Sequence, residues 1–363
     1  MSPFDNHPSP KKEKYSARHQ LFRSFSIIMI ASSTLVNCAE DNLSQAKPSK
    51  QTIRILSLDG AGIDAVSQAS FLEQLEKNTG KSVTETFHMV GATSLSGFLS
   101  MALTTPLNST FGWKPKISAD DFVEIFKTEG HKIYRKNLPS LTANLEPTYD
   151  TRSYQKMAGR FFGKAKIDDS IIDTVVITQN LDNGAPKVFK SWDTSERFLS
   201  SDIALASSAA PYHFDSCCIL PTSNSTVRGG YLALVDAKTI LKNPTAYLLS
   251  EAQKRYPGCN YEIVSIGSVM NAKTDNFTKE ELSWKEIGDQ AMMTHKYLIR
   301  LYPESYTRWV AVTHNPYSRE DDGHINNINY RELAVQNMIE DRKDDFQRLV
   351  EKLSQPRDLV LPS

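Results

Sequence analysis

Two stretches near the start of the chain share one pattern: an apolar run, a turn of small residues, and then a segment with the character of a helix. In the first stretch, TIRILSLDGAG (residues 52–62) is rich in β-branched residues and ends on glycines. In the second, ETFHMVGATSLSG (residues 85–97) leads into FLSMALTTP, which stops at Pro106. Two strand–turn–helix units in succession predict an α/β fold whose turns gather at the carboxyl ends of the strands, where ligands bind. The apolar positions that follow the first turn at helical spacing are Val66, Ala69, Leu72 and Leu75.

The rest of the pattern fits the same fold class. DTVVITQNLDNGAPKVFKSW (173–192) predicts two strands joined by a polar turn, and SSDIALASSAAPYHFDS (200–216) predicts a helix of small residues. NYEIVSIGS (260–268) predicts a final core strand. Beyond it the chain is polar, with amphipathic segments such as ELAVQNMI. We therefore expect a core domain over residues 53–270 and a helical C-terminal extension over 271–363 that packs on it.

Residues 1–38 predict an export leader. Basic residues precede FSIIMIASSTLVNC, an apolar run that is too short to span a bilayer but has the length of a signal-peptide core. The run ends at Cys38, and LVNC is similar to a bacterial lipobox, in which that cysteine would be lipidated, although Asn37 replaces the usual small residue. Residues 39–52 are polar and predict a linker. We expect an exported or membrane-anchored protein, with a cytoplasmic or unanchored secreted protein as the alternative.

Charge and cysteine content narrow the function classes. Lys plus Arg and Asp plus Glu both total 42, so no overall basic field favours nucleic acid as a partner. Cys217, Cys218 and Cys259 lack the spacing of a zinc or redox site, and the histidines lack an H-E-x-x-H pattern. We expect buried free thiols, no metal and no cofactor.

Ser94 is the candidate nucleophile. A serine on a sharp strand-to-helix turn points away from its own backbone and meets the amide hydrogens of the helix start. In GATSLSG, Ala92 and Ser96 take the glycine positions of the usual G-x-S-x-G spacing, so a helix-capping serine is the alternative. The neighbouring turn DGAG (59–62) could supply the amides of an oxyanion hole. A phosphate-binding turn is less favoured, because this chain has no matching glycine pattern.

The chain resembles the patatin-like phospholipases over roughly residues 53–270. SLDGAGID, GATSLSG, ALASSAAPYHF, a GG turn and a strand ending in SIGS follow one another in that family's order. The resemblance implies a three-layer α/β/α sandwich with a central mixed sheet. It also implies hydrolysis of lipid or other acyl esters, at a membrane surface, by a serine–aspartate dyad without a metal. It places Ser94 on the nucleophile and Gly60, Ala61 and Gly62 on the oxyanion loop.

The catalytic base does not follow from the resemblance as readily. The family's aspartate lies in a D-G-[GA] turn, and the matching turn here is VRGGYLALVD, with Arg228 at the position of the missing aspartate. A guanidinium cannot take the proton of Ser94, and loss of the base costs about four orders of magnitude in rate. Arg228 could instead contact a lipid phosphate or carboxylate. Asp236 and Asp215 are the candidate substitute bases, each with a turn or cap as its alternative role.

Two functions are compatible with this pattern. The first is a patatin-like acyl hydrolase, of the phospholipase A or lysophospholipase type, that acts through Ser94. The second is a catalytically impaired member of the family that binds lipid or a protein partner, and Arg228 favours it. A third interpretation, an unrelated α/β binding protein, would leave Ser94 far from the DGAG turn.

Overall fold

The structure is a computed structural model. The chain divides into two units, and all the residues that the structure describes belong to the larger one, Pro48–Ser363. For residues 279–289 only the backbone is described. Within the described stretches, no helix combines the length and the apolar character needed to cross a membrane. The described stretches are residues 51–107, 114–137, 147–222, 231–271, 279–314 and 319–358.

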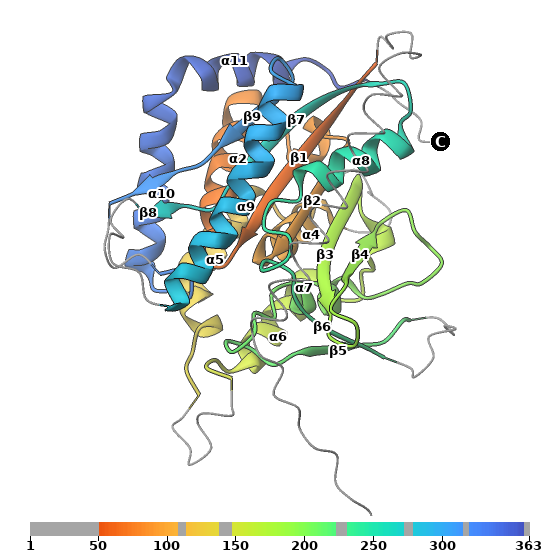
Figure 1. Cartoon of the computed structure of the whole chain (residues 1–363), viewed down its shortest axis with the longest axis vertical. Helices are drawn as coiled ribbons and strands as arrows, with labels where there is room; N and C mark the ends of the chain where they lie inside the picture. Colours follow the sequence, from red (N-terminus) through yellow and green to blue (C-terminus); the bar gives the residue numbers. More distant parts are fainter. Residues whose placement is uncertain are drawn as a thin grey trace, which may run out of the picture. The chain divides into compact units, whose positions relative to one another are not determined.

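A mixed sheet lies at the centre of this unit (Figure 1). The strand order is β5-β6-β3-β2-β1-β7-β9, and β4 also pairs with β3. Strands β3, β2, β1, β7 and β9 are parallel, whereas β4 and β6 are antiparallel to β3, and β5 is antiparallel to β6. The strands are β1 (Thr52–Ala61), β2 (Met89–Ser94), β3 (Asp173–Asn180), β4 (Pro186–Lys190), β5 (Cys217–Ile219), β6 (Leu232–Asp236), β7 (Asn260–Ile266) and β9 (Tyr306–Trp309), with a separate pair β8 (Met270–Asn271) and β10 (Val312–Thr313).

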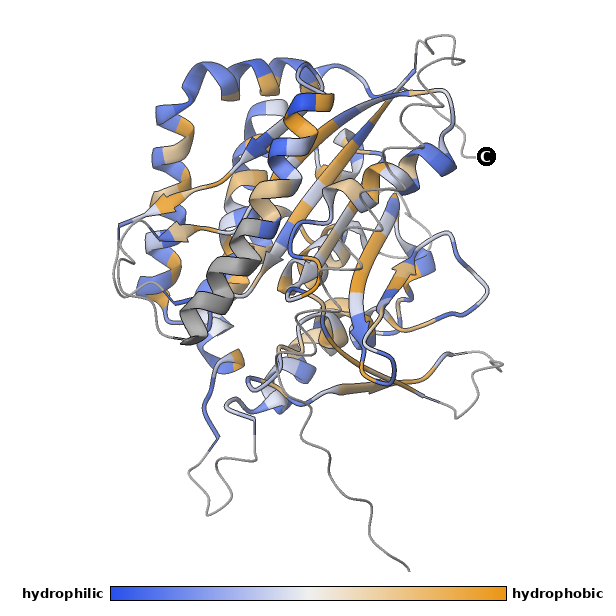
Figure 2. Cartoon of the chain, viewed as in Figure 1, coloured by the Kyte–Doolittle hydropathy of each residue, from blue (hydrophilic) through white to orange (hydrophobic). Residues whose placement is uncertain are grey.

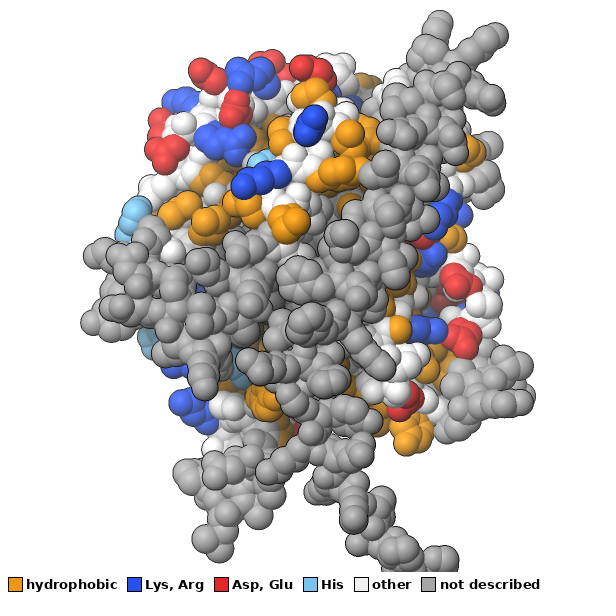
Figure 3. Space-filling model, viewed as in Figure 1, with side chains coloured by type: hydrophobic (Ala, Val, Ile, Leu, Met, Phe, Trp, Pro, Cys, Tyr) orange, Lys and Arg blue, Asp and Glu red, His pale blue; other side chains and the backbone are white. Residues whose placement is uncertain are grey.

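Helices cover both faces of the sheet, which confirms the three-layer α/β/α architecture (Figure 1). Helices α2, α4 and α7 pack on one face, with α5, α6, α10 and α11 outside them, and α8 and α9 lie on the other face. Acidic and basic side chains are interspersed over the region of α11 (Figure 3). The helices are α2 (Ala65–Thr79), α3 (Val83–Thr86), α4 (Leu95–Thr104), α5 (Ala119–Ile133), α6 (Thr151–Phe162), α7 (Ser200–Ser207), α8 (Thr245–Arg255), α9 (Lys279–Leu301), α10 (Ile325–Asp341) and α11 (Lys343–Ser354), with a 3-10 turn at Ile167–Asp169.

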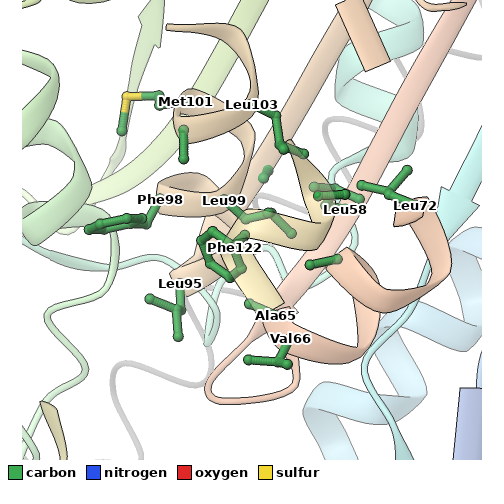
Figure 4. Close-up of a cluster of buried hydrophobic side chains, with 14 of the residues drawn as sticks. Leu58, Ala65, Val66, Leu72, Leu95, Phe98, Leu99, Met101, Leu103 and Phe122 are labelled. Carbon is green, nitrogen blue, oxygen red and sulfur yellow. The ribbon is translucent and has the colours of Figure 1, made fainter. Parts of the chain in front are cut away.

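The two faces of the sheet bury two separate hydrophobic clusters, because alternate side chains of a strand point to opposite faces. Leu56 and Leu58 of β1 join the larger cluster, together with α2 and α4. Ile53 and Ile55 of the same strand join the smaller cluster, together with α8. Figure 4 shows part of the larger cluster, with Phe98 of α4 among its members. The sheet is therefore buried on both sides where the candidate site begins.

Most of the elements expected from the sequence are present. The two strand–turn–helix units are confirmed as β1–α2 and β2–α4, and the two-stranded turn as the antiparallel pair β3–β4. The expectation that residues 260–268 form the final core strand is wrong, because β9 pairs with β7 and extends the sheet. Its sequence YTRW buries only its first and last residues, so it lacks the long apolar run of a central strand. The C-terminal residues thus contribute a strand as well as helices.

Candidate active site

Ser94 has the backbone of a strained turn. It ends β2 and directly precedes α4, with φ 60° and ψ −149°. A positive φ is unfavourable for any residue with a β-carbon, and such strain collects at functional sites. The side chain makes no capping hydrogen bond to α4, so Ser94 does not have the helix-capping role that was the alternative. Its hydroxyl is therefore available for another partner.

Helix α4 packs so closely on its neighbours that residue 97 must be a glycine. The G-x-S-x-G pattern around Ser94 would place this glycine one residue earlier, at position 96. A β-carbon on Gly97 would lie 2.4 Å from Ser207 Oγ and 2.9 Å from Val176 Cγ1. Ser96, at the expected glycine position, is accommodated because its hydroxyl donates to the carbonyl of Asp59 over 2.7 Å. The turn thus keeps its tight packing despite the departure from the usual pattern.

Asp236 is the hydrogen-bond partner of Ser94. Ser94 Oγ donates to Asp236 Oδ2 over 2.6 Å, and the backbone N–H of Lys238 donates to Asp236 Oδ1 over 2.7 Å. Ser94 and Asp236 are each only 3 % exposed. The carboxylate is therefore fixed by two hydrogen bonds, with one oxygen directed at the serine.

Strand β3 brings these two residues together. Thr93 of β2 stands opposite Ile177, and Asp236 of β6 stands opposite the next residue, Thr178. Both strands lie on the same side of β3, because β4 pairs with Ile177 and Thr178 from the other side. Since β2 is parallel to β3 and β6 is antiparallel, their carboxyl ends meet head to head beside Ser94.

The environment of Asp236 favours a base of intermediate strength. Burial raises the pKa of Asp236 from its usual value of 3.8 to about 6, although the hydrogen bonds from Ser94 and from the Lys238 amide act in the opposite direction. A general base works best when its pKa lies near the operating pH. Asp236 is therefore mostly ionised at neutral pH, and in that form its carboxylate can accept the proton of Ser94.

The glycine loop, residues 59–62, runs beside Ser94. Ala61 stands opposite Ser94 in the β1–β2 ladder. The N–H of Gly60 donates to the carbonyl of Lys242 over 2.7 Å, so this amide is already bonded within the protein. The structure thus brings the expected loop next to the serine, and it differs from the expectation in that the Gly60 amide is occupied. The interpretation that separated Ser94 from the DGAG turn is wrong.

Glu320 and Lys238 enclose the glycine loop. The carbonyl of Glu320 accepts the N–H of Ile63 over 2.8 Å and lies 2.3 Å from the position of a β-carbon on Gly62. The carboxylate of Glu320 forms an ion pair with the ammonium of Lys238. A β-carbon on Gly60 would lie 2.7 Å from Thr93 Oγ1 and 3.2 Å from Lys238 Cγ. Glycine is therefore required at both positions by close packing.

Two arginines from the C-terminal part of the chain pair with Asp59, the first residue of the glycine loop, and with Asp64, the N-cap of α2 just beyond it. Arg308 in β9 donates from Nη1 to Asp59 Oδ1 over 3.0 Å and from Nη2 to Asp59 Oδ2. Asp64 pairs with Arg331 in α10. All four side chains are less than 10 % exposed. Because a buried charge without a partner is strongly unfavourable, these pairs tie the loop to elements more than two hundred residues away.

Other predicted site residues lie elsewhere. The carboxylate of Asp215 accepts a hydrogen bond from Thr151 Oγ1 over 3.3 Å, and within the described stretches no hydrogen bond joins it to Ser94. Arg228 and Cys38 are outside the described residues. No cluster of three potential metal ligands occurs in the part that is described. The three described cysteines are free, as expected, but none is buried: Cys217 and Cys259 are half-buried and Cys218 is exposed.

The sequence carried a signal for Asp236. If the D-G-[GA] turn is matched to the glycine pair at 229–230, the aspartate position falls on Arg228 and not on Asp236. Asp236 directly follows the apolar run LALV, however, and functional residues gather at the carboxyl ends of such strands. With Asp236 in the aspartate position, Ala237 and Lys238 take the two positions that follow the aspartate in the D-G-[GA] turn.

The chain is similar in sequence to known proteins. A family profile described as Patatin-like phospholipase matches residues 56–249, more than half of the chain. Patatin-like protein 2 of Oryza sativa subsp. indica is 25 % identical over 232 residues, which cover 59 % of this chain and 56 % of that protein. Patatin-like protein 4 of Arabidopsis thaliana is 29 % identical over 184 residues, which cover 46 % of this chain and 45 % of that protein. The chain thus matches about half the length of these curated relatives.

Among solved structures, VipD from Legionella pneumophila is similar at 12 % sequence identity with a TM-score of 0.33. The match covers 81 % of this chain and 68 % of that one. The type III effector protein ExoU matches at 11 % identity with a TM-score of 0.28 and covers 83 % of this chain and 63 % of that one.

Proposed function

The chain belongs to the patatin-like phospholipase family, and on that premise we propose that it hydrolyses lipid acyl esters with Ser94 as the nucleophile and Asp236 as the base. The observation that carries this proposal is the 2.6 Å hydrogen bond from Ser94 Oγ to Asp236 Oδ2. The positive φ of Ser94 and the raised pKa of Asp236 support it. A carboxylate at residue 236 removes the need for one at residue 228.

In the proposed reaction, Asp236 takes the proton of Ser94 while Oγ attacks the carbonyl carbon of the ester. The carbonyl oxygen becomes an oxyanion, which the backbone amides of the glycine loop stabilise, apart from the Gly60 amide that is bonded to Lys242. Asp236 then gives the proton to the leaving alcohol, and the acyl group stays on Ser94. A water molecule then loses a proton to Asp236 and attacks the acyl carbon. As the bond to Ser94 Oγ breaks and the acid leaves, Asp236 returns that proton to Oγ, which restores both residues.

The test is hydrolysis of p-nitrophenyl butyrate by the full chain. We expect Ser94→Ala and Asp236→Asn each to lower kcat by about three orders of magnitude or more, because each removes one half of the nucleophile–base unit. Asp215→Asn is the matched control, since it removes a carboxylate that is hydrogen-bonded to Thr151 instead, and it should retain full turnover. Unchanged turnover in Asp236→Asn would contradict the assignment of the base.

A catalytically impaired protein that binds lipid or a protein partner is the second candidate. The position of Glu320 favours it, because its carbonyl lies against Gly62, next to the proposed oxyanion site. In that case the wild type would hydrolyse the ester no faster than Ser94→Ala. The contact is made by a main-chain carbonyl, so Glu320→Ala would leave it in place and should not restore turnover.

A further inference from the structure

Lys238 follows the proposed base by two residues and lies against the glycine loop. Its backbone N–H donates to Asp236 Oδ1 over 2.7 Å. Its side-chain Cβ and Cγ lie 3.3 Å and 3.2 Å from the position of a β-carbon on Gly60, and the residue is only 5 % exposed. Figure 2 shows β3 hydrophobic along its middle and hydrophilic at its carboxyl end, where β2 and β6 meet beside it. A buried cation thus lies at the polar edge of the sheet that carries the dyad.

Glu320 holds the charged end of the Lys238 side chain. The carboxylate of Glu320 forms an ion pair with the ammonium of Lys238. The main-chain carbonyl of the same residue accepts the N–H of Ile63, just beyond the glycine loop, over 2.8 Å. The side chain of Lys238 therefore starts beside the base, passes Gly60 and ends at a residue that is bonded to the far end of the loop.

The glycine loop uses part of its hydrogen-bonding capacity within the protein. The N–H of Gly60 donates to the carbonyl of Lys242 over 2.7 Å, and the N–H of Ile63 donates to the carbonyl of Glu320. These bonds leave at most the amides of Ala61 and Gly62 for an oxyanion. Lysine side chains and backbone amides can both stabilise a developing negative charge. A cation beside the loop would therefore supply part of the stabilisation that the occupied amides do not.

The charge of Lys238 acts at the dyad itself. Burial raises the pKa of Asp236 to about 6, whereas the charge of Lys238 lowers this pKa and the charge of Glu320 raises it. The carboxylate of Asp236 lies 2.6 Å from Ser94 Oγ, the atom to which the tetrahedral intermediate is bonded. Charges in a buried site are screened much less than charges in water. A positive charge that affects Asp236 therefore also affects an oxyanion formed at Ser94.

We propose that Lys238 is a further catalytic residue, whose ammonium contacts the oxyanion and stabilises it together with the remaining amides of the glycine loop. This inference rests on the proposed function, because the oxyanion forms only if Ser94 attacks an ester. An ammonium has three N–H donors, so it can bond to Glu320 and to the oxyanion at once. It keeps its proton throughout the reaction, and proton transfer stays with Asp236.

The test is hydrolysis of p-nitrophenyl butyrate by the full chain carrying Lys238→Met, which removes the charge and keeps the backbone N–H. We expect kcat to fall about a hundredfold while KM stays within about twofold, because the lost contact exists only in the transition state. The inhibition constant of butylboronic acid, which forms an anionic tetrahedral adduct with Ser94, should rise by about the same factor. Lys190→Met is the matched control, since Lys190 pairs with the buried carboxylate of Glu251 over 2.6 Å, and it should change none of these quantities.

A second variant separates the charge of Lys238 from a structural role of its ion pair. Glu320→Gln removes the other half of the pair and keeps the main-chain carbonyl. Because the positive charge remains, turnover at pH 8 should stay at or above the wild-type level. The inflection in kcat/KM should move above about pH 6 in Lys238→Met and below it in Glu320→Gln, since the two charges act on Asp236 in opposite directions.

Three outcomes overturn the proposal: wild-type kcat in Lys238→Met, unchanged inhibition by butylboronic acid, or equal losses of turnover in Lys238→Met and Glu320→Gln. If Lys238→Met does not fold, by circular dichroism, Lys238→Gln takes its place. Turnover that depends on Ser94 but not on Lys238 would contradict this inference alone. A wild type no faster than Ser94→Ala would contradict the proposed function and this inference together.

Discussion

Ser94 and Asp236 are the last residues of two strands that run toward each other along the same side of β3. Their meeting is therefore set by the register of the sheet rather than by the conformation of a loop. A shift of β6 by one residue would turn the side chain of Asp236 to the opposite face and separate it from the serine. The buried packing of β6 against α7 opposes such a shift.

The pH dependence of turnover reports the state of Asp236. Its pKa is raised by burial to about 6, and only the ionised form can accept the proton of Ser94. We expect kcat/KM for a neutral ester to increase as the pH rises through about 6 and to level off above pH 7. A profile measured between pH 4 and pH 8 checks this. An inflection near pH 4, where an exposed aspartate titrates, would contradict the raised pKa.

The same shift predicts that Asp236 reduces stability at neutral pH. A carboxyl whose folded pKa is raised contributes stability that is present below its unfolded pKa and lost as the pH rises through the folded value. Asparagine cannot ionise, so at pH 8 we expect the free energy of unfolding of Asp236→Asn to exceed that of the wild type by up to about 3 kcal/mol. Near pH 3.5 the difference should almost vanish. Urea unfolding at the two pH values measures it.

The strain at Ser94 predicts an unusual preference for glycine. Alanine at this position keeps the unfavourable positive φ, whereas glycine adopts it without strain. We expect Ser94→Gly to be more stable than Ser94→Ala by about 1 kcal/mol, because relief of strain outweighs the larger chain entropy of glycine in the unfolded state. Both variants lack the hydroxyl, so the lost hydrogen bond to Asp236 cancels in the comparison. Chemical denaturation of the two inactive proteins checks the sign, and a more stable alanine variant would contradict it.

Gly97 is expected to be intolerant of even a methyl group. A β-carbon there would lie 2.4 Å from Ser207 Oγ, so Gly97→Ala should cost about 1–3 kcal/mol of stability and displace the serine turn, with loss of turnover. Ser207→Gly in the same chain removes the nearest atoms and should restore part of both. Gly159→Ala in α6 is the control, since no atom lies within 4 Å of its β-carbon, and it should be neutral or stabilising. Thermal unfolding and ester hydrolysis measure the two effects.

Removal of Arg331 should destabilise the protein strongly. Asp64 is 1 % exposed, and Arg331→Met would leave the charge of Asp64 buried without its arginine partner. This should cost about 3–5 kcal/mol of stability. The additional change Asp64→Asn should recover a large part of that loss, because it removes the unpaired charge. Arg348→Met is the control: its partner Asp345 is 42 % exposed, so the cost should stay below about 1 kcal/mol. Equal losses in the two single variants would contradict the role assigned to burial.

The fold class and one half of the candidate site could be predicted from local sequence. In both β1–α2 and β2–α4, the strand, the turn and the helix lie within about thirty consecutive residues, so their apolar spacing and small residues are visible together. Ser94 and the glycine loop are therefore each recognisable from local sequence alone. The strand β9 was not, because a short edge strand with two polar residues has no distinctive pattern.

The sequence by itself indicated a serine on a strand-to-helix turn and a glycine loop in the preceding strand–turn–helix unit, because the residues that make each turn are neighbours in the chain. Only the tertiary structure decided which carboxylate reaches it. Ser94 and Asp236 are 142 residues apart, and their contact depends on two strands that end at adjacent positions of a third. The arginines that hold the glycine loop are farther still. Strand register and the need to pair buried charges determine these partners. A local sequence pattern contains neither kind of information, because both depend on residues that are far apart in the chain.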